Sequence, residues 1–72
     1  MNKLTIENLP NKLKILRVEK QLPQKTVAKT LGITLSAYSN YEQGIREPSN
    51  EVLIKICQYF CVSADYLLGL EN

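Results

Sequence analysis

Residues 35–43 combine small polar side chains at a spacing that suits hydrogen-bond recognition. On a helix, with about 100° between residues, one face presents Ser36, Ser39, Asn40 and Gln43. Serine and asparagine are mediocre helix formers, and an ordinary solvated face favours Lys, Glu and Arg instead. Asparagine can pair bidentately with adenine, and serine can donate to or accept from a base edge. The pattern therefore favours a face that contacts base edges, with a plain surface of small residues as the alternative.

Apolar residues flank this polar stripe on the same segment. Leu35 takes the first helical position, where it is not expected to be fully buried and can contact a thymine methyl group. Tyr38, Tyr41 and Ile45 share the opposite side and are expected to face the core. The segment is therefore predicted to be a helix with one inner and one outer face.

Helical periodicity continues through the rest of the chain and predicts an all-α fold of five helices. Leu9, Leu13 and Leu16 recur at helical spacing, and Pro10 suits the first turn of their helix because its missing N–H costs nothing there. Serine or threonine precedes three helices as an N-cap, and glycine ends three of them. The helices are expected over about residues 10–20, 24–31, 35–43, 50–60 and 64–68, with caps at Thr34, Ser49 and Ser63 and stops at Gly32, Gly44 and Gly69.

The second and third predicted helices have the spacing of a helix-turn-helix. Residues 24–31 and 35–43 are separated by a tight turn that contains Gly32. Ala28 stands where the two helices must approach closely, because a larger side chain would force them apart. The sequence therefore predicts a helix-turn-helix in these two helices.

The composition limits both the architecture and the chemistry. Seventy-two residues predict one domain, 1–72, with residues 1–8 as an N-terminal extension, a core over about residues 9–69 and no separate sensing domain.

Histidine is absent and the only cysteines are Cys57 and Cys61, so no four-ligand zinc site can be built from Cys and His. No nucleophile paired with a base is evident, so we expect no enzyme, no cofactor and no small-molecule ligand. The chain also lacks a signal core and an apolar run of the ~20 residues that span a membrane, which predicts a cytoplasmic protein with reduced thiols.

Charge is unevenly distributed along the chain. Residues 1–34 hold seven basic and two acidic groups, a balance of +5, whereas residues 35–72 hold two basic and five acidic groups, a balance of −3. A basic half on a chain of net charge +2 indicates a surface for a polyanion, and an ordinary solvated surface is the alternative. Lys25 is the first candidate for a phosphate contact because it lies in the first turn of its helix. Four further lysines can contact phosphates or only add solubility: Lys12, Lys14, Lys20 and Lys29.

Several motifs at fixed spacing resemble a known family. Residues 24–44, QKTVAKTLGITLSAYSNYEQG, followed by Arg46-Glu47-Pro48-Ser49, look like the lambda-repressor-like, Cro/C1-type helix-turn-helix family, often called XRE regulators in bacteria. The likeness extends from about Leu13 through Leu68 and includes the ending VSADYLLG at residues 62–69. It implies a compact five-helix domain whose third helix enters the major groove of DNA.

The resemblance also implies roles for individual residues. Gln24 matches a family glutamine that contacts a DNA phosphate and buttresses the recognition helix. Arg17 and Glu42 match a partly buried ion pair that ties the first helix to the third, a structural role. Leu35, Ser36 and Asn40 match positions that face base edges, and the adjacent Ala37 and Ser39 are predicted to contact bases with them. The predicted phosphate-contacting residues are Gln24, Lys25, Gln43 and Arg46.

Four positions depart from the family pattern. Pro23 stands where many members have a Ser or Asn cap, and Leu35 stands where a polar residue is commoner. Tyr38 fills a core position usually held by Ile or Val, which requires local repacking. Cys61 follows the fourth helix where Gly or Asn is common, and a positive φ at this residue would cost about 1 kcal/mol.

These observations predict a sequence-specific, double-stranded DNA-binding transcriptional regulator, and in particular a repressor that binds a palindromic operator as a homodimer. The alternative function is a protein-interaction module, such as an antitoxin or anti-repressor on the same scaffold. The apolar segment 66–70 can form a dimer surface or cap a single core. Cys57 is expected in the core, and no basic neighbour in the sequence supports a redox role for Cys61.

Overall fold

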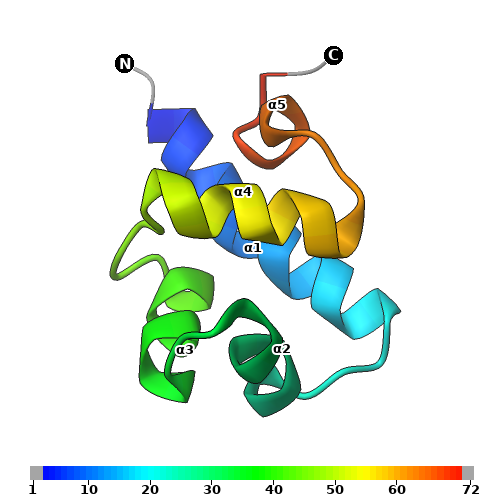
Figure 1. The fold of residues 1–72 in the computed structure, drawn as a ribbon. Coiled ribbons are helices and arrows are strands. Elements are labelled where there is room, and N and C mark those ends of the chain that lie inside the picture. Colours follow the sequence, from blue (N-terminus) through cyan, green and yellow to red (C-terminus); the bar gives the residue numbers. More distant parts are fainter. Residues whose placement is uncertain (1–2, 71–72) are drawn as a thin grey trace.

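The computed structural model describes the backbone of residues 3–70 and the side chains of residues 9–70 (Figure 1). Five helices and no strand occur in this described part, which confirms the all-α prediction. The three middle helices have the predicted bounds. The helices are α1 (Lys3–Glu19), α2 (Gln24–Leu31), α3 (Leu35–Gln43), α4 (Asn50–Phe60) and α5 (Ala64–Leu67).

Helix α1 is longer than predicted. It begins at Lys3, so Pro10 lies inside the helix and residues 3–8 are not an extension separate from it, while residues 1–2 lie outside the described part. Pro10 removes one backbone hydrogen bond from the helix. However, its neighbour Leu9 and the later Leu13 are only 5% and 0% exposed. Burial of one continuous apolar face therefore outweighs the local preference of proline for a first turn.

The helices enclose one small core. Helices α2 and α3 lie at one end of the molecule, and α5 and the start of α1 lie at the other (Figure 1). Helix α1 packs against α3 and α5, and α4 packs against α2 and α5. All five helices contribute to the buried core, which consists of Leu9, Leu13, Val27, Ala28, Leu31, Tyr38, Ile56, Phe60 and Leu67. None of the helices within residues 3–70 has both the length and the apolar character needed to cross a membrane.

The turn between α2 and α3 follows from three residues. Gly32 adopts φ 75° and ψ 29°, and its N–H donates to the carbonyl oxygens of Ala28 and Lys29. Thr34 then caps α3, because its Oγ1 accepts from the Ala37 N–H at 3.0 Å. Ala28 is 2% exposed, as expected where the two helices approach closely. The predicted helix-turn-helix geometry is therefore present.

The ends of the later helices combine confirmed and corrected predictions. Ser49 and Ser63 cap α4 and α5 through the N–H groups of Val52 and Tyr66, as predicted. Helix α5 ends at Leu67, slightly earlier than expected, and Gly69 follows at φ 75°. The prediction that Ile45 faces the core is wrong, since this side chain is 64% exposed.

The reason for the error lies at the end of α3. Gly44 adopts φ 77° and ψ 12° and ends α3, so Ile45 no longer follows the helical rotation that would bring it beside Tyr41. The turn at Gly44 also lies against α1, because a Cβ there would be 3.5 Å from the Cγ of Pro10.

The two cysteines lie in different environments. Cys57 is half-buried against the core, and burial raises the pKa of its thiol. Cys61 is exposed and adopts the left-handed conformation, φ 57° and ψ 46°, at the end of α4. The positive φ considered from the sequence is therefore present, on a residue with a Cβ.

Candidate nucleic-acid interface

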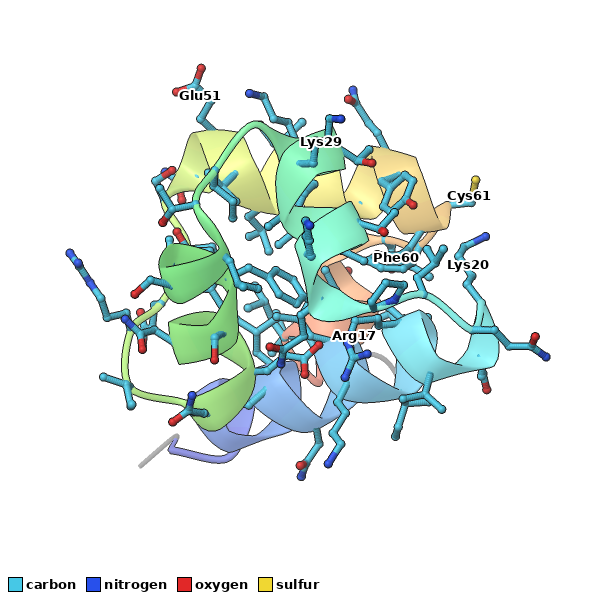
Figure 2. All side chains as sticks on the ribbon, turned by 90° about the horizontal axis from the view of Figure 1, so that it is seen from below. Arg17, Lys20, Lys29, Glu51, Phe60 and Cys61 are labelled. Carbon is cyan, nitrogen blue, oxygen red and sulfur yellow. The ribbon has the colours of Figure 1, made fainter. Side chains whose placement is uncertain are left out.

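The outer face of α3 is uncharged and accessible, on the side of the molecule seen in Figure 2. Leu35 is 49% exposed at the start of the helix, and Tyr38 on the inner face is 0% exposed. The other predicted contact residues of α3 divide into exposed Ser36 and Gln43 and half-buried Ala37, Ser39 and Asn40. Of the predicted base-contacting residues, Leu35 and Ser36 are thus exposed, and Ala37, Ser39 and Asn40 are partly accessible.

Beneath this face, one carboxylate joins three helices. Glu42 on α3 accepts from Arg17 on α1, with Nε–Oε2 2.6 Å and Nη2–Oε1 3.2 Å. Gln24 on α2 donates from Nε2 to Oε1 at 3.0 Å, and the Tyr38 hydroxyl donates to Oε2 at 2.6 Å. The Glu42 side chain is 4% exposed. The ion pair and the buttressing contact of Gln24 implied by the resemblance are therefore both formed, and Tyr38 adds a further donor.

The electrostatics of this cluster favour an ionised carboxylate. Burial opposes ionisation, but hydrogen bonds from Arg17, Tyr38 and Gln24 outweigh it and lower the pKa of Glu42. The hydrogen bond to Glu42 raises the pKa of Arg17 against the effect of burial. Burial, and then the hydrogen bond to Glu42, raise the pKa of Tyr38. A charged Arg17–Glu42 pair beside a neutral phenol therefore holds α3 in place.

Arg17 also fixes the approach to α2. Its Nη1 donates to the carbonyl oxygen of Leu22 at 2.8 Å, in the turn just before the helix. In Figure 2 the Arg17 side chain lies near the centre of the view, between α1 and the pair formed by α2 and α3. One guanidinium thus ties the turn before α2 to α3, which sets the relative position of the two helices of the helix-turn-helix.

The sequence suggested the residues of this cluster only in part. Nothing in the residue types required a hydrogen bond from Tyr38 to Glu42, although their i, i+4 spacing on one helix is compatible with one. Tyr38 is fully buried, so the local repacking expected at this position takes the form of a ring in the core and a hydroxyl on the carboxylate.

The predicted phosphate-contacting residues lie at the start of α2, at the end of α3 and in the loop after α3. Lys25 is exposed in the first turn of α2, where Pro23 provides no side-chain cap, and Arg46 is exposed in the loop after α3. Gln43 is exposed at the end of α3, and its Nε2 donates to the Oγ of Ser39 at 2.8 Å. Gln24 is half-buried because its amide contacts Glu42.

The candidate lysines are not equivalent. Lys20 and Lys29 are both exposed, and Lys20 extends from the edge of the molecule in Figure 2. Lys12 instead makes internal contacts: its Nζ donates to the carbonyl oxygen of Tyr66 at 2.7 Å and lies 4.5 Å from the centre of the Tyr66 ring. Lys12 therefore ties α1 to the end of α5 and is not available as a free phosphate ligand.

Within residues 3–70, no group of three His, Cys, Asp or Glu side chains is placed to hold a metal ion.

The C-terminal apolar segment is largely internal, since Leu67 is 0% exposed and only Leu70, at 61%, is open to solvent.

Comparison with known proteins identifies the family to which this arrangement belongs. A helix-turn-helix family model matches residues 13–67, a range that includes Arg17, both helices of the motif, and α4. The chain belongs to the Cro/C1-type helix-turn-helix family. The expected family and the five-helix, lambda-repressor-like fold are thus confirmed.

Relatives of this Cro/C1-type domain are named as transcriptional regulators. The uncharacterized HTH-type transcriptional regulator YqaE of Bacillus subtilis is 50% identical over 60 residues, which cover 83% of this chain and 52% of the relative. ImmR of the same organism is 39% identical over 65 residues, covering 90% and 51%. The cryptic phage CTXphi transcriptional repressor RstR of Vibrio cholerae is 35% identical over 52 residues, covering 72% and 47%. The chain spans about half the length of these relatives.

A solved structure with the same fold contains DNA. The P22 c2 repressor, crystallised with a synthetic operator, matches the Cro/C1-type domain with a TM-score of 0.82 and 25% identity. The match covers 88% of this chain and 96% of the repressor chain. The arrangement of helices described above is therefore that of a repressor domain seen on an operator.

Proposed function

We propose that this chain is the DNA-binding part of a transcriptional regulator and that α3 enters the major groove of its operator. The observation on which this rests is the fold match to the P22 c2 repressor, whose structure includes a synthetic operator. The outer face of α3 supports the proposal independently, because its exposed polar side chains, Ser36 and Gln43, are neutral. Such groups can approach base edges without placing an unpaired charge against them.

Base recognition is assigned to the outer face of α3. Ser36 and Asn40 provide hydrogen-bonding groups one turn apart, and Asn40 can pair bidentately with adenine. Leu35 is 49% exposed and can contact a thymine methyl group. Ala37 and Ser39 lie beside these residues, and their small side chains allow the helix to approach the bases closely.

Phosphate contacts are assigned to the residues around this face. Gln24 and Lys25 lie at the start of α2, where the helix dipole favours an anion, and Arg46 lies in the loop after α3. Gln43 at the end of α3 completes the set. These contacts set the register of α3 on the duplex and contribute salt-dependent affinity without reading the sequence.

We assign the regulator a repressing action as a homodimer on a palindromic operator, in which each copy reads one half-site. Repression would follow from occupation of DNA that the polymerase needs. Two exposed apolar side chains are available for a contact between copies: Ile54 on α4 is 56% exposed, and Leu70, which follows α5, is 61% exposed. One relative named as a transcriptional repressor, RstR, and the P22 c2 repressor among the solved structures support the direction of the regulatory effect.

Selection of bound sequences from random duplexes tests this function. The wild-type chain should enrich a motif with two-fold symmetry and half-sites about one helical turn apart, and light scattering should show a dimer on the selected duplex. Ser36→Glu, which places a carboxylate on the outer face of α3, should abolish enrichment. The domain should stay folded, because residue 36 is exposed. Absence of any enriched motif for the wild type at low salt would contradict the function.

A further inference from the structure

Two side chains on the outer face of α3 hydrogen bond to each other. The Nε2 of Gln43 donates to the Oγ of Ser39 at 2.8 Å, one turn earlier on the helix. Gln43 is exposed and Ser39 is half-buried, and neither side chain belongs to the buried core. An exposed hydrogen bond of this kind adds little to the stability of the fold. It does determine which hydrogen-bonding groups the outer face of α3 presents to a ligand.

The direction of this hydrogen bond determines what Ser39 can offer to a ligand. A serine hydroxyl has one hydrogen to donate and two lone pairs to accept with. Because Gln43 donates, the bond occupies a lone pair of Ser39 and leaves the hydroxyl hydrogen for another acceptor. If the amide were turned over, its Oε1 would accept that hydrogen, and Ser39 would present only its two lone pairs, which accept hydrogen bonds.

A DNA phosphate beside Gln43 would select the first orientation. Phosphate oxygens only accept hydrogen bonds, so they attract the amide nitrogen and exclude the amide oxygen. Gln43 has two N–H groups on Nε2, which allows one to donate to Ser39 while the other donates to the phosphate. The phosphate contact and the donor state of Ser39 are thus coupled through a single side chain.

We propose that Gln43 is a positioning residue that makes Ser39 a hydrogen-bond donor to a base acceptor in the major groove. This inference rests on the proposed function. In the major groove, purines present N7, guanine also presents O6, and thymine presents O4, whereas cytosine presents only its N4 amino donor. Ser39 should therefore disfavour cytosine at the base position it contacts.

The test measures base preference rather than affinity alone. Ser39→Ala first identifies the base pair concerned, as the position in the selected motif where preference relaxes. At that position the wild type should prefer an acceptor base over cytosine, and Gln43→Met should lower this preference roughly two- to tenfold, the range of one net hydrogen bond. Gln43→Met should also weaken binding to all duplexes through the lost phosphate contact.

A double variant separates positioning from a direct contact. In the Ser39→Ala background, Gln43→Met should cause no further loss of base preference, because Gln43 acts through Ser39. Gln58→Met on α4 is the matched control and should leave the preference unchanged. Thermal melts by circular dichroism should show that all variants remain folded.

Three results would overturn the inference. The first is a wild-type preference for cytosine at the base that Ser39 contacts, and the second is a base preference that Gln43→Met leaves unchanged. The third is a loss of base preference on Gln43→Met that is equal in the wild-type and Ser39→Ala backgrounds. Each of these presupposes that the wild type enriches a motif. Failure of the proposed function is recognised separately, because the wild type then enriches no motif at all.

Discussion

Arg17 and Glu42 form a two-point ion pair that joins α1 to α3, with Nε–Oε2 2.6 Å and Nη2–Oε1 3.2 Å. The guanidinium side chain is 15% exposed and the carboxylate side chain 4%. A pair so shielded differs from a surface salt bridge, because removal of one partner leaves the other charge poorly solvated. The pair therefore links the orientation of the proposed recognition helix to the stability of the whole domain.

Replacement of Arg17 should destabilise the domain. Arg17→Ala should lower the free energy of unfolding by roughly 2–4 kcal/mol, between the values for surface and fully buried pairs. Arg17→Lys should cost less, since it keeps the charge but loses the two-point geometry. Urea unfolding followed by circular dichroism measures both. Arg46→Ala, at an exposed loop position, serves as the control, and an equal cost for Arg17→Ala and Arg46→Ala would contradict the prediction.

The stability of the domain should depend on Glu42 in acid. Because hydrogen bonds lower the pKa of Glu42 in the folded state, the unfolded chain binds more protons at low pH. The stabilisation is present above the unfolded-state pKa, about 4.3 for a glutamate, and is lost as the pH falls through the lower folded-state pKa.

Glu42→Gln provides the measurement for this pH dependence. The wild-type free energy of unfolding should fall as the pH is lowered below about 5, and Glu42→Gln should show a shallower fall, because its site no longer titrates. Glu47→Gln, which removes an exposed carboxylate from the loop, should keep the wild-type slope. Parallel pH profiles for wild type and Glu42→Gln would refute the assignment.

The hydroxyl of Tyr38 should contribute to stability apart from its ring. Tyr38→Phe keeps the buried ring but removes a donor at 2.6 Å from an ionised carboxylate, which should cost about 1.5–3 kcal/mol. Tyr41→Phe on the same helix is the control, since the Tyr41 hydroxyl makes no hydrogen bond within the described residues and its loss should cost little. Equal unfolding midpoints for the two variants would show that the Tyr38 hydroxyl adds nothing.

The strained end of α4 offers a stabilising change. Cys61 adopts φ 57°, a conformation that costs an L-residue roughly 1–2 kcal/mol and that glycine adopts freely. After the entropy that glycine loses on folding, Cys61→Gly should gain about 0.5–1 kcal/mol. Cys61→Ala should show no such gain because it keeps the Cβ. Thermal melts of the two variants under reducing conditions decide the question.

Asn40 and Gln24 should affect DNA binding in different ways. Asn40→Ala should cost about 1–3 kcal/mol on the preferred operator and relax preference at one base pair, because Asn40 is assigned to a base edge. Gln24→Ala should weaken binding to all duplexes with little change in preference, because Gln24 is assigned to a phosphate and supports Glu42. Competition titrations with operator variants measure both quantities. A uniform loss in Asn40→Ala would reassign that residue to positioning.

Local chemistry made much of the fold predictable from the sequence. The bounds of α3 follow from the Thr34 cap and the Gly44 stop, which act over four or five residues and need no tertiary context. The same local rules gave the wrong start for α1, which was expected at Pro10. The helix includes residues before the proline because the burial of Leu9 and Leu13 outweighs the hydrogen bond lost at Pro10. They also failed to place Ile45, because helical periodicity stops at Gly44.

For the candidate site, the sequence by itself determined the residue types, the neutral outer face of α3 and the resemblance that pairs Arg17 with Glu42. Only the tertiary structure showed that four donors from Arg17, Gln24 and Tyr38 meet on one carboxylate and that Lys12 is bound to Tyr66. The physical reason is distance along the chain. Helix caps and faces are set by neighbours within one or two turns, whereas a hydrogen bond between residues 54 positions apart exists only after the core has brought their helices together.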